Sequence, residues 1–480
     1  MIEMRLAEVA AVTGGHLHRA SGAERVSAVE FDSRAVGPGG LFLALPGERA
    51  DGHAFAAAAV AAGAAGVLAA RPVDAPAVIV PPAPRAAGTA LDEHDPDGAG
   101  AAVLAALARL ARHVVEALPA LAVVGVTGSS GKTSTKDLLA AVLAPLGPTV
   151  APPGSFNNEL GLPWTALRAG PDTRHLVLEF SARGRGHIAA LAAAVPPRIG
   201  VVLNVGSAHL GEFGSTAAIA GAKGELVEAL PAGGLAVLNA DDPLVAAMAD
   251  RTAARVQLVG CGAGAGISAQ DVRLDRGRAR FRLVSPTGSA SVALRLVGGH
   301  HVGNALAAAA VALELGGTPE SVAAALGSAT PASRWRMEVT ERPDGVTVIN
   351  DAYNANPDSM RAALAALAAV GAGRRTWAVL GRMGELGPEA GAAHAGVAAE
   401  ARRAGVAELV TVDAPDYGAG RAVADVDEAA GLLAAELAPG DVVLVKASRA
   451  AGLERLAATL LVSGEPCSST AHHSQARRAT

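Results

Sequence analysis

The chain has 480 residues, too many for a single hydrophobic core, which indicates roughly three domains. Its formal net charge of -5 excludes a general nucleic-acid-binding protein, because no basic surplus exists to neutralise a phosphate backbone. Two distant cysteines, no signal-peptide core and no run apolar enough to span a bilayer favour a cytoplasmic protein without membrane insertion.

The first domain is expected over residues 1–85, where short apolar runs alternate with turns and end in a strand at 77–80. The prolines at 81–84 and the polar segment 92–98 are typical of a linker. A helix over 101–118 follows, inside a central domain that we expect over residues 98–331.

The segment 123–135 is an apolar strand that feeds a glycine-rich turn and then a helix opened by Lys132 and Thr133. Glycines let backbone N–H groups turn inward around phosphate oxygens, and the helix N-terminus and Lys132 add positive charge. Thr133 would place a hydroxyl on a magnesium ion. Val126 stands where the strict pattern has glycine, so this is a variant phosphate loop. The residues predicted to bind ATP here are Thr127, Gly128, Ser129, Ser130, Gly131, Lys132, Thr133 and Ser134.

Three further apolar runs, at 175–180, 199–204 and 235–239, are typical of strands in a parallel sheet covered on both faces. Glu179 lies at the end of the first run, where a carboxylate can face the magnesium of a nucleotide. The same carboxylate could instead pair with Arg183 or Arg185.

Two residues further along the chain are ambiguous when considered alone. His209 follows the strand at 199–204 and is either a metal ligand or a structural histidine. Lys223 lies on a helix, and its spacing alone predicts only a solvated surface lysine.

The residues after this point indicate a small antiparallel excursion at 262–284 and a helix at 304–315. A second doubly wound, Rossmann-like domain is expected over residues 332–463, and a disordered tail over 464–480. Its predicted elements are strands at 346–349, 376–380, 408–412 and 442–445 and a helix at 390–404.

The order of these motifs resembles the Mur ligase family, whose members form amide bonds with ATP during peptidoglycan precursor synthesis. The matching segments are the loop 127–133, Glu179, the run 204–209 and the run 222–225. The resemblance implies an α/β chain of three domains: a small N-terminal domain, a central phosphate-loop domain with a mostly parallel sheet and flanking helices, and a C-terminal Rossmann-like domain.

The resemblance also implies the cofactors and the catalytic residues, which are Lys132, Glu179, His209 and Lys223. Lys223 would be carbamylated by carbon dioxide and, with Thr133, Glu179 and His209, would hold Mg²⁺. Asn304 would contact the adenine of ATP, and Arg336 and Asp351 would contribute to ATP from the last domain.

Later motifs resemble the branch of the family that adds D-alanyl-D-alanine to UDP-N-acetylmuramoyl-tripeptide. They include 32–34, 39–45, 51–55, 157–163, 333–338 and 348–360. The predicted substrate-binding residues are Ser33, Arg34, Asp51, His53, Asn158, Tyr353, Asn354 and Asn356. The turn at 51–53 and Asn158 could instead be ordinary loop residues, and Asn354 and Asn356 could cap the helix near Asp358.

Two alternatives remain open: the family member that adds a diamino acid at the third position, and a non-catalytic nucleotide-binding paralogue. The chain departs from the family pattern at Ser181, in place of glycine, and at Arg382, in place of an acidic residue. No long heptad pattern appears, so we expect a monomer.

Overall fold

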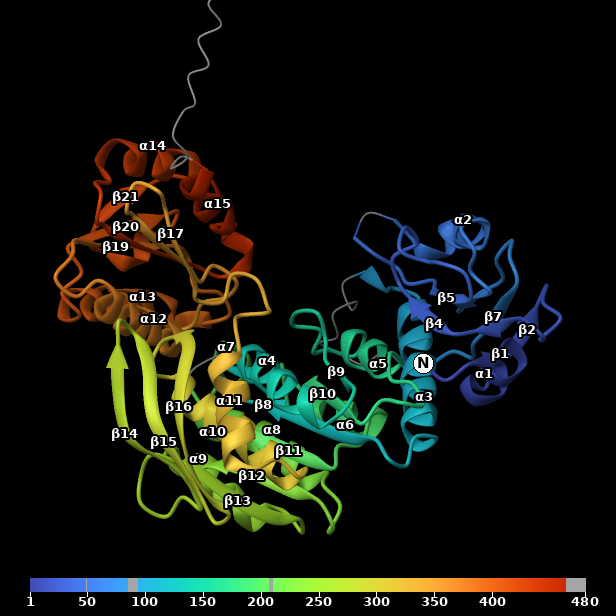
Figure 1. Ribbon diagram of the computed structural model, residues 1–480. Coiled ribbons are helices and arrows are strands. Elements are labelled where there is room, and N and C mark those ends of the chain that lie inside the picture. The colour runs from blue at the N-terminus through green and yellow to red at the C-terminus, as the bar shows by residue number, and fades with distance from the viewer. Residues whose placement is uncertain (49, 85–93, 207–209, 463–480) are drawn as a thin grey trace, which may run out of the picture. The chain divides into compact units, whose positions relative to one another are not determined.

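The computed structural model describes residues 1–48, 50–84, 94–206 and 210–462 (Figure 1). The chain forms two compact units. The first comprises Met1–Arg334 together with Glu385–Glu389, and the second comprises Trp335–Gly384 and continues from Ala390. The domain limits expected at residues 85, 98 and 331 remain predictions, and the tail from 464 lies outside the described residues.

The N-terminal part of the first unit is built on a small sheet with strand order β2-β7-β6-β5-β4. Strands β4 to β7 are parallel, and β2 is antiparallel to β7. A separate antiparallel pair is formed by β1 and β3. The elements are β1 Met4–Arg5, α1 Leu6–Thr13, β2 His16–His18, β3 Arg25–Val26, β4 Ala28–Glu30, β5 Gly40–Leu43, α2 Ala56–Ala61, β6 Gly66–Ala69 and β7 Ala77–Ile79.

The large sheet of the first unit has the strand order β16-β15-β14-β13-β12-β11-β8-β10-β9 among the described residues. Strands β8 to β13 are parallel, whereas β14, β15 and β16 form the antiparallel excursion that the sequence predicted. The strands are β8 Ala122–Thr127, β9 Thr149–Val150, β10 His175–Glu179, β11 Ile199–Val202, β12 Leu235–Asn239, β13 Arg255–Gly260, β14 Ile267–Asp275, β15 Arg278–Ser285 and β16 Gly288–Val297.

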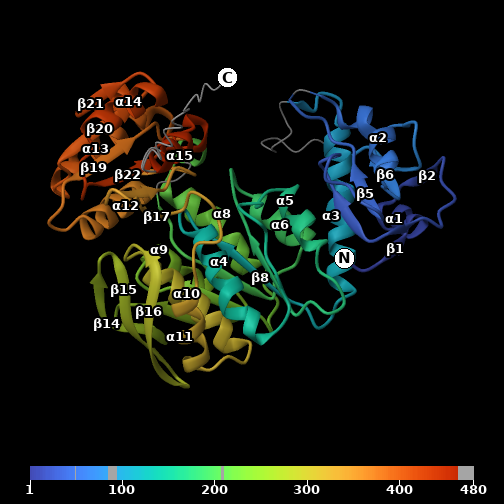
Figure 2. The ribbon, with the colours of Figure 1, turned by 45° about the horizontal axis from the view of Figure 1, so that its top comes forward.

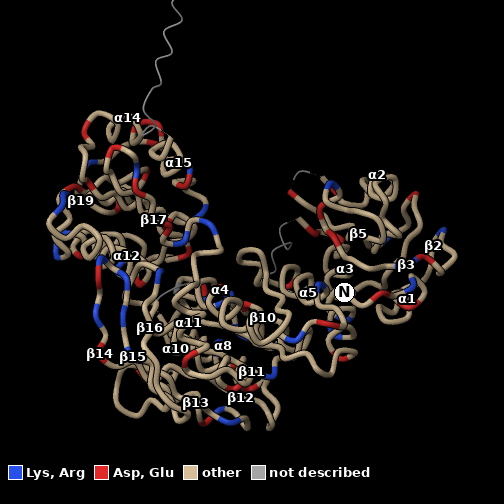
Figure 3. Tube along the Cα trace, in the orientation of Figure 1, with Lys and Arg blue, Asp and Glu red and all other residues tan. Residues whose placement is uncertain are grey.

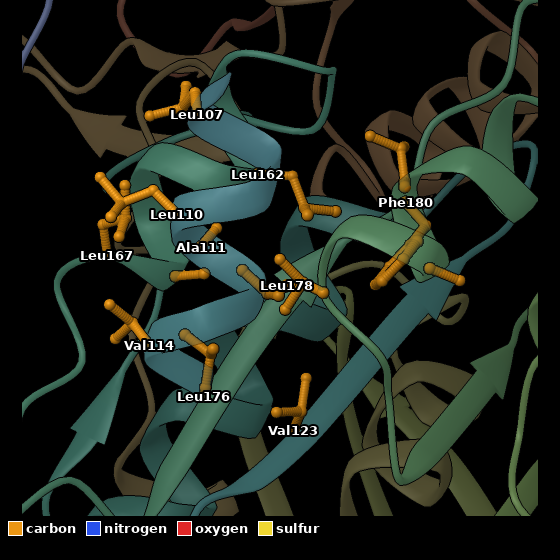
Figure 4. Close-up of a cluster of buried hydrophobic side chains, with 14 of the residues drawn as sticks. Leu107, Leu110, Ala111, Val114, Val123, Leu162, Leu167, Leu176, Leu178 and Phe180 are labelled. Carbon is orange, nitrogen blue, oxygen red and sulfur yellow. The ribbon is translucent and has the colours of Figure 1, made fainter. Parts of the chain in front are cut away.

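Helices cover both faces of this sheet. Because successive residues of a strand point to opposite faces, each strand contributes side chains to two hydrophobic cores. Leu176 and Leu178 of β10 pack with α3, whereas Val177 packs in the core formed by α4, α10 and α11 (Figures 1, 2 and 4). Figure 4 shows Leu107, Leu110 and Val114 of α3 in the same buried cluster as Leu176 and Leu178. The helices are α3 Ala99–Glu116, α4 Lys132–Leu143, α5 Gly161–Ala166, α6 His187–Ala194, α7 Leu210–Phe213, α8 Thr216–Glu228, α9 Pro243–Ala246, α10 His301–Glu314 and α11 Pro319–Ser328.

The second unit contains a sheet with strand order β17-β18-β22-β19-β20-β21 in its described part. All neighbours are parallel except β17, which pairs antiparallel with β18 at the edge. The elements are β17 Glu338–Glu341, β18 Thr347–Asn350, α12 Pro357–Val370, β19 Thr376–Leu380, α13 Ala390–Arg403, β20 Glu408–Val412, β21 Arg421–Val423, α14 Val426–Glu436, β22 Val442–Lys446 and α15 Glu454–Val462.

The predicted α/β fold class is confirmed, with a mostly parallel central sheet and a doubly wound second unit. No helix in the described residues is long and apolar enough to cross a membrane. Acidic and basic residues are interspersed along the trace (Figure 3). Even on the arginine-bearing strand β15, Arg280 and Arg282 lie 3.8 and 3.7 Å from the carboxylates of Asp275 and Asp271.

Candidate active site

The phosphate loop lies between the end of β8 and the start of α4, as the sequence predicts. Gly131 is the N-cap of α4 and has a φ of +83°, a left-handed conformation that favours glycine. Lys132 donates a hydrogen bond from Nζ to the Gly128 carbonyl over 2.6 Å. Thr127, at the strand end, donates from Oγ1 to the Phe180 carbonyl over 2.8 Å, which ties the loop to the end of β10.

Asn204, at the end of the neighbouring strand β11, shapes the loop. Its Oδ1 accepts from the Ser130 N–H over 2.9 Å, and its Nδ2 donates to the Ser130 carbonyl over 3.2 Å. Ser129 adds a bond from its own N–H to the Asn204 carbonyl over 3.1 Å. The loop is therefore fixed by Asn204, which follows β11, as well as by contacts within the loop.

Glu179 is completely buried at the end of β10, where three polar side chains face one of its oxygens. Oε2 accepts from Thr133 Oγ1 at 3.2 Å, from Ser155 Oγ at 3.1 Å and from Asn157 Nδ2 at 3.3 Å. Oε1 has no hydrogen-bond partner among the described residues. No ion pair joins the described residues Glu179 and Arg183 or Arg185, so the alternative pairing is absent here. Buried carboxylate and hydroxyl oxygens with an open lone pair suit a hard divalent cation.

Lys223 lies on α8 and is only 4% exposed. The prediction of a solvated surface lysine, made from its spacing alone, is therefore wrong. Burial, and then the nearby Lys132 cation, lower the pKa of Lys223 well below its ordinary value. No carboxylate in the described part of the chain forms an ion pair with it. His209, the other predicted metal ligand, lies outside the described residues.

Two neighbours of Lys223 fix the helix that carries it, and sequence reasoning missed both. Glu225 accepts from the N–H groups of Gly186 and Ala189, at 2.6 and 3.1 Å, and so holds the start of α6. Arg251 donates to the carbonyls of Ala220 and Gly221 at 3.0 and 2.9 Å. A Cβ at Gly224 would lie 1.9 Å from the Arg251 guanidinium, which explains the glycine there.

Asn304, predicted to contact adenine, is buried on α10 directly beside the phosphate loop. Its Oδ1 is 2.9 Å from the position that a Cβ at Gly131 would occupy. Its Nδ2 lies 3.4 Å from Nδ1 of His301, whose pKa burial lowers well below the ordinary value.

The predicted uridine-end residues lie in two turns of the N-terminal sheet. Arg34 donates from Nη2 to Asp32 at 2.7 Å and lowers the pKa of that carboxyl to about 2, while Ser33 is half-buried beside them. Asp51 caps the short helix at 52–55 by accepting from the His53 N–H at 3.0 Å. The turn at 51–53 thus has a local structural role, as its alternative reading allowed.

An aromatic cluster joins this part to the central sheet. Phe31, next to Asp32, packs at 5.4 Å between ring centroids against Trp164, which in turn lies 5.0 Å from Phe156. Trp164 Nε1 also donates to the Val29 carbonyl at 3.0 Å. Asn158, two residues after Phe156, accepts from the Gly161 N–H at 2.9 Å and so braces the start of α5.

The predicted residues of the second unit gather where β18 and β22 end. Lys446 Nζ lies 2.6 Å from Asp351 Oδ2 and donates to the Asn354 carbonyl at 2.8 Å. The guanidinium of Arg336 lies 4.0 Å from the centroid of the Tyr353 ring. Asn356 accepts from the Ser359 N–H at 2.9 Å and caps α12, which supports its capping role, whereas Asn354 makes no such cap.

The two departures from the family pattern are both accommodated locally. Ser181 donates to the Asn157 carbonyl at 2.8 Å, beside the Glu179 cluster. Arg382 pairs with Asp413 at 3.3 Å on the surface of the second unit. Neither residue displaces a predicted site residue.

The chain is similar to known proteins along almost its whole length. Three models match the chain: the Mur ligase family catalytic domain over residues 25–113, the Mur ligase middle domain over 126–312, and the Mur ligase glutamate ligase domain over 335–449. The UDP-N-acetylmuramoyl-tripeptide--D-alanyl-D-alanine ligase of Mycobacterium tuberculosis is 57% identical across 98% of this chain and 99% of its own length.

Two solved structures are also similar along almost the whole chain. MurF from Acinetobacter baumannii matches with a TM-score of 0.84 and 30% identity, over 96% of this chain and 99% of its own. The MurF ligase from Thermotoga maritima in complex with ADP matches with a TM-score of 0.76 and 29% identity, over 92% and 98%.

Proposed function

We propose, since this chain belongs to the Mur ligase family, that its phosphate loop and the Glu179 cluster are the catalytic centre of peptide-bond formation. The protein is an ATP-dependent ligase that joins D-alanyl-D-alanine to UDP-N-acetylmuramoyl-tripeptide, yielding the pentapeptide precursor of peptidoglycan, ADP and phosphate. The observation that carries the assignment of the site is the junction of Thr133, from the phosphate-loop helix, with the buried carboxylate of Glu179.

ATP would bind with its phosphates against residues 127–134, at the N-terminus of α4. Lys132, now bonded to the Gly128 carbonyl, would turn to the transferred phosphoryl group. Asn304 would contact the adenine, and Arg336 and Asp351 would contribute from the second unit.

The residues also fit a magnesium ion. Thr133 Oγ1 and Glu179 supply hard oxygen ligands, and Glu179 Oε1 retains an unused lone pair in a completely buried position. His209 is proposed as a further ligand. When bound, magnesium would neutralise the phosphate charge that develops during transfer.

Lys223 is proposed to act as a carbamate. An uncharged amine is the form that attacks carbon dioxide, and the lowered pKa of Lys223 favours that form. The N–C bond forms as one C=O π bond of CO₂ becomes a carboxylate, and the amine loses one proton to solvent. The product is an anion that suits Mg²⁺. Loss of activity in Lys223→Ala, partly restored by short carboxylic acids, would support this role; an active Lys223→Ala would refute it.

The reaction follows from these placements. A carboxylate oxygen of the tripeptide attacks the γ-phosphorus of ATP, ADP leaves, and Lys132 offsets the growing charge on the phosphoryl oxygens. The amine of D-alanyl-D-alanine then attacks the acyl carbon, phosphate leaves, and the amine loses its proton. Exclusion of water protects the acyl phosphate in between.

We propose separate groups of residues for the UDP-muramoyl end of the substrate and for the peptide or dipeptide. Ser33, Arg34, Asp51, His53 and Asn158 are proposed for the UDP-muramoyl end and Tyr353, Asn354 and Asn356 for the peptide or dipeptide. We propose that the reaction takes place in the cytoplasm, where ATP is available, and that the protein is a monomer that binds no nucleic acid.

The test is phosphate release from Mg·ATP and UDP-muramoyl-tripeptide, with and without D-alanyl-D-alanine. Release that requires both, with a pentapeptide product by mass, supports the proposal. Turnover of UDP-muramoyl-dipeptide with a diamino acid instead would favour the third-residue ligase, and ATP binding without turnover would favour a non-catalytic paralogue.

A further inference from the structure

Lysine is rare in this chain, and its few positions are informative. Only four of the forty basic residues are lysines: Lys132, Lys136, Lys223 and Lys446. Arginine occupies every other basic position, including all those on the surface. Lys136, Lys223 and Lys446 are 3%, 4% and 2% exposed, and Lys132 is half-buried at the phosphate loop. All four lysines therefore lie at buried or half-buried positions.

Lys136 lies one turn after Lys132 on α4 and takes no part in the reaction described above. Its ammonium group faces three acceptors: the Pro152 carbonyl at 3.0 Å, Ser333 Oγ at 3.1 Å and the carboxylate of Asp137. An ammonium has three N–H donors in a tetrahedral arrangement, so all three can be satisfied at once. The planar fork of arginine could not match this set in the same buried space.

Asp137 completes the cluster by holding the same serine. It accepts from the Ser333 N–H at 3.0 Å and from Ser333 Oγ at 3.1 Å. The contacts span 196 and 197 positions of sequence and attach the end of the first unit to α4. We call Lys136, Asp137 and Ser333 the α4 clamp.

The clamp lies immediately before the second unit, which begins at Trp335. Beyond the boundary the chain is fixed again, because the Trp335 carbonyl accepts from the Tyr353 N–H at 3.3 Å and the Met337 N–H donates to Asp351 at 3.1 Å. Trp335 and Met337 both have positive φ, 59° and 51°, which side-chain-bearing residues adopt only when contacts hold them. Between the two anchored segments stands the exposed Arg334.

We propose that Lys136, Asp137 and Ser333 are positioning residues of the ligase reaction, which fix the point where the chain leaves the phosphate-loop helix for the second unit. The inference rests on the proposed function, because Arg336, three residues after Ser333, is one of the proposed ATP contacts. The three side chains thereby attach the chain segment before Arg334 to the helix that carries Lys132 and Thr133. The chain crosses between the two units again at Glu385 and at Ala390.

The test compares Ser333→Ala and Lys136→Arg with the wild-type chain and with Ser328→Ala. Ser328 is a matched control, since its Oγ also makes a part-buried bond, to the Ala325 carbonyl at 2.9 Å, at the end of α11. Each variant is assayed for Tm, for kcat and KM with ATP and dipeptide, and for the rate of tryptic cleavage after Arg334, quantified by mass. The cleavage rate reports local opening of the linker independently of catalysis.

Ser333→Ala is expected to lower kcat about tenfold, because small displacements of reacting groups are costly, with KM for the dipeptide within about twofold. Cleavage after Arg334 should accelerate several-fold while Tm falls by no more than about 4 °C. Lys136→Arg keeps the positive charge but should show the same fall in kcat and the same faster cleavage as Ser333→Ala. Ser328→Ala should match the wild-type chain in both kcat and cleavage rate.

Wild-type kcat and cleavage rates in both clamp variants would overturn the proposal. So would losses of activity that merely follow a fall in Tm, as these would make the cluster structural only. An inactive wild-type protein would instead overturn the proposed function. Faster cleavage after Arg334 in the variants would still show that the α4 clamp holds the chain at this point.

Discussion

Thr133 Oγ1 lies 3.2 Å from Glu179 Oε2, a contact between the first turn of α4 and the last residue of β10. Forty-six positions separate the two residues, and the parallel pairing of β8 with β10 brings them together. The contact unites the two groups that phosphoryl transfer needs beside the nucleotide, a hydroxyl on the phosphate-loop helix and a buried carboxylate.

Glu179→Gln should remove the metal-binding charge with little change in shape. We expect kcat to fall at least 100-fold and the magnesium concentration needed for half-maximal phosphate release to rise, because a neutral amide is a poor ligand for a hard cation. Magnesium titrations of phosphate release measure this. Glu116→Gln, at an exposed position on α3, is the control and should titrate like wild type. An unchanged magnesium dependence in Glu179→Gln would remove Glu179 from the metal site.

Gly131→Ala should weaken nucleotide binding. The new methyl group would need a left-handed backbone at φ +83° and would lie 2.9 Å from Asn304 Oδ1, so both the loop and Asn304 must move. We expect ADP affinity to fall at least tenfold, measured by calorimetry. Gly405→Ala is the control. Gly405 has a similar φ of +74°, and a Cβ added there would have no atom within 4 Å. This variant therefore has only the backbone strain, which costs about 1–2 kcal/mol. Equal ADP affinities in the two variants would contradict the steric argument.

Lys223→Met should stabilise the fold at neutral pH although it abolishes ligation. The pKa of Lys223 is lower in the folded chain than its ordinary 10.5, so protonation of this amine favours the unfolded chain at pH values below 10.5. Removing the amine should raise the free energy of unfolding by about 1–3 kcal/mol at pH 7.5, and the gain should vanish as pH approaches 10.5. Urea unfolding in buffer purged of CO₂ measures it. A destabilised variant with the same deficit at every pH would show that Lys223 is charged and paired.

Asp351→Asn should destabilise the second unit more than the double variant Asp351→Asn/Lys446→Met does. The single change leaves the Lys446 ammonium buried without its carboxylate partner 2.6 Å away, which costs about 3–5 kcal/mol. The double change removes both charges and should recover a large part of that loss. A double-variant cycle in urea measures the coupling. Strictly additive effects would mean that the two side chains do not stabilise each other.

The local signals in the sequence located the phosphate loop and the strand that ends at Glu179. Each depends on neighbours along the chain: an apolar run, a glycine-rich turn and a helix start are all visible within residues 123–143. The capping role of Asn356 was likewise foreseen as an alternative, because a cap needs only the next three residues.

Contacts between distant segments could not be foreseen in the same way. Asn204 braces Ser130 because β11 lies beside β8, and Ser155 and Asn157 reach Glu179 from a loop without periodicity. Lys446 looks like an ordinary strand-end lysine until the sheet order sets it beside Asp351. Only the scarcity of lysine in the composition could have marked Lys136 in advance.

The central claim is that this site transfers the γ-phosphoryl group of ATP to the tripeptide carboxylate before the amide bond forms. The most direct test uses UDP-muramoyl-tripeptide labelled with ¹⁸O in its terminal carboxylate, with Mg·ATP and D-alanyl-D-alanine. We expect one ¹⁸O atom in each released phosphate, because the C–O bond of the acyl phosphate breaks when the amine attacks. Glu179→Gln should release labelled phosphate much more slowly. Pentapeptide formation with unlabelled phosphate would contradict the account.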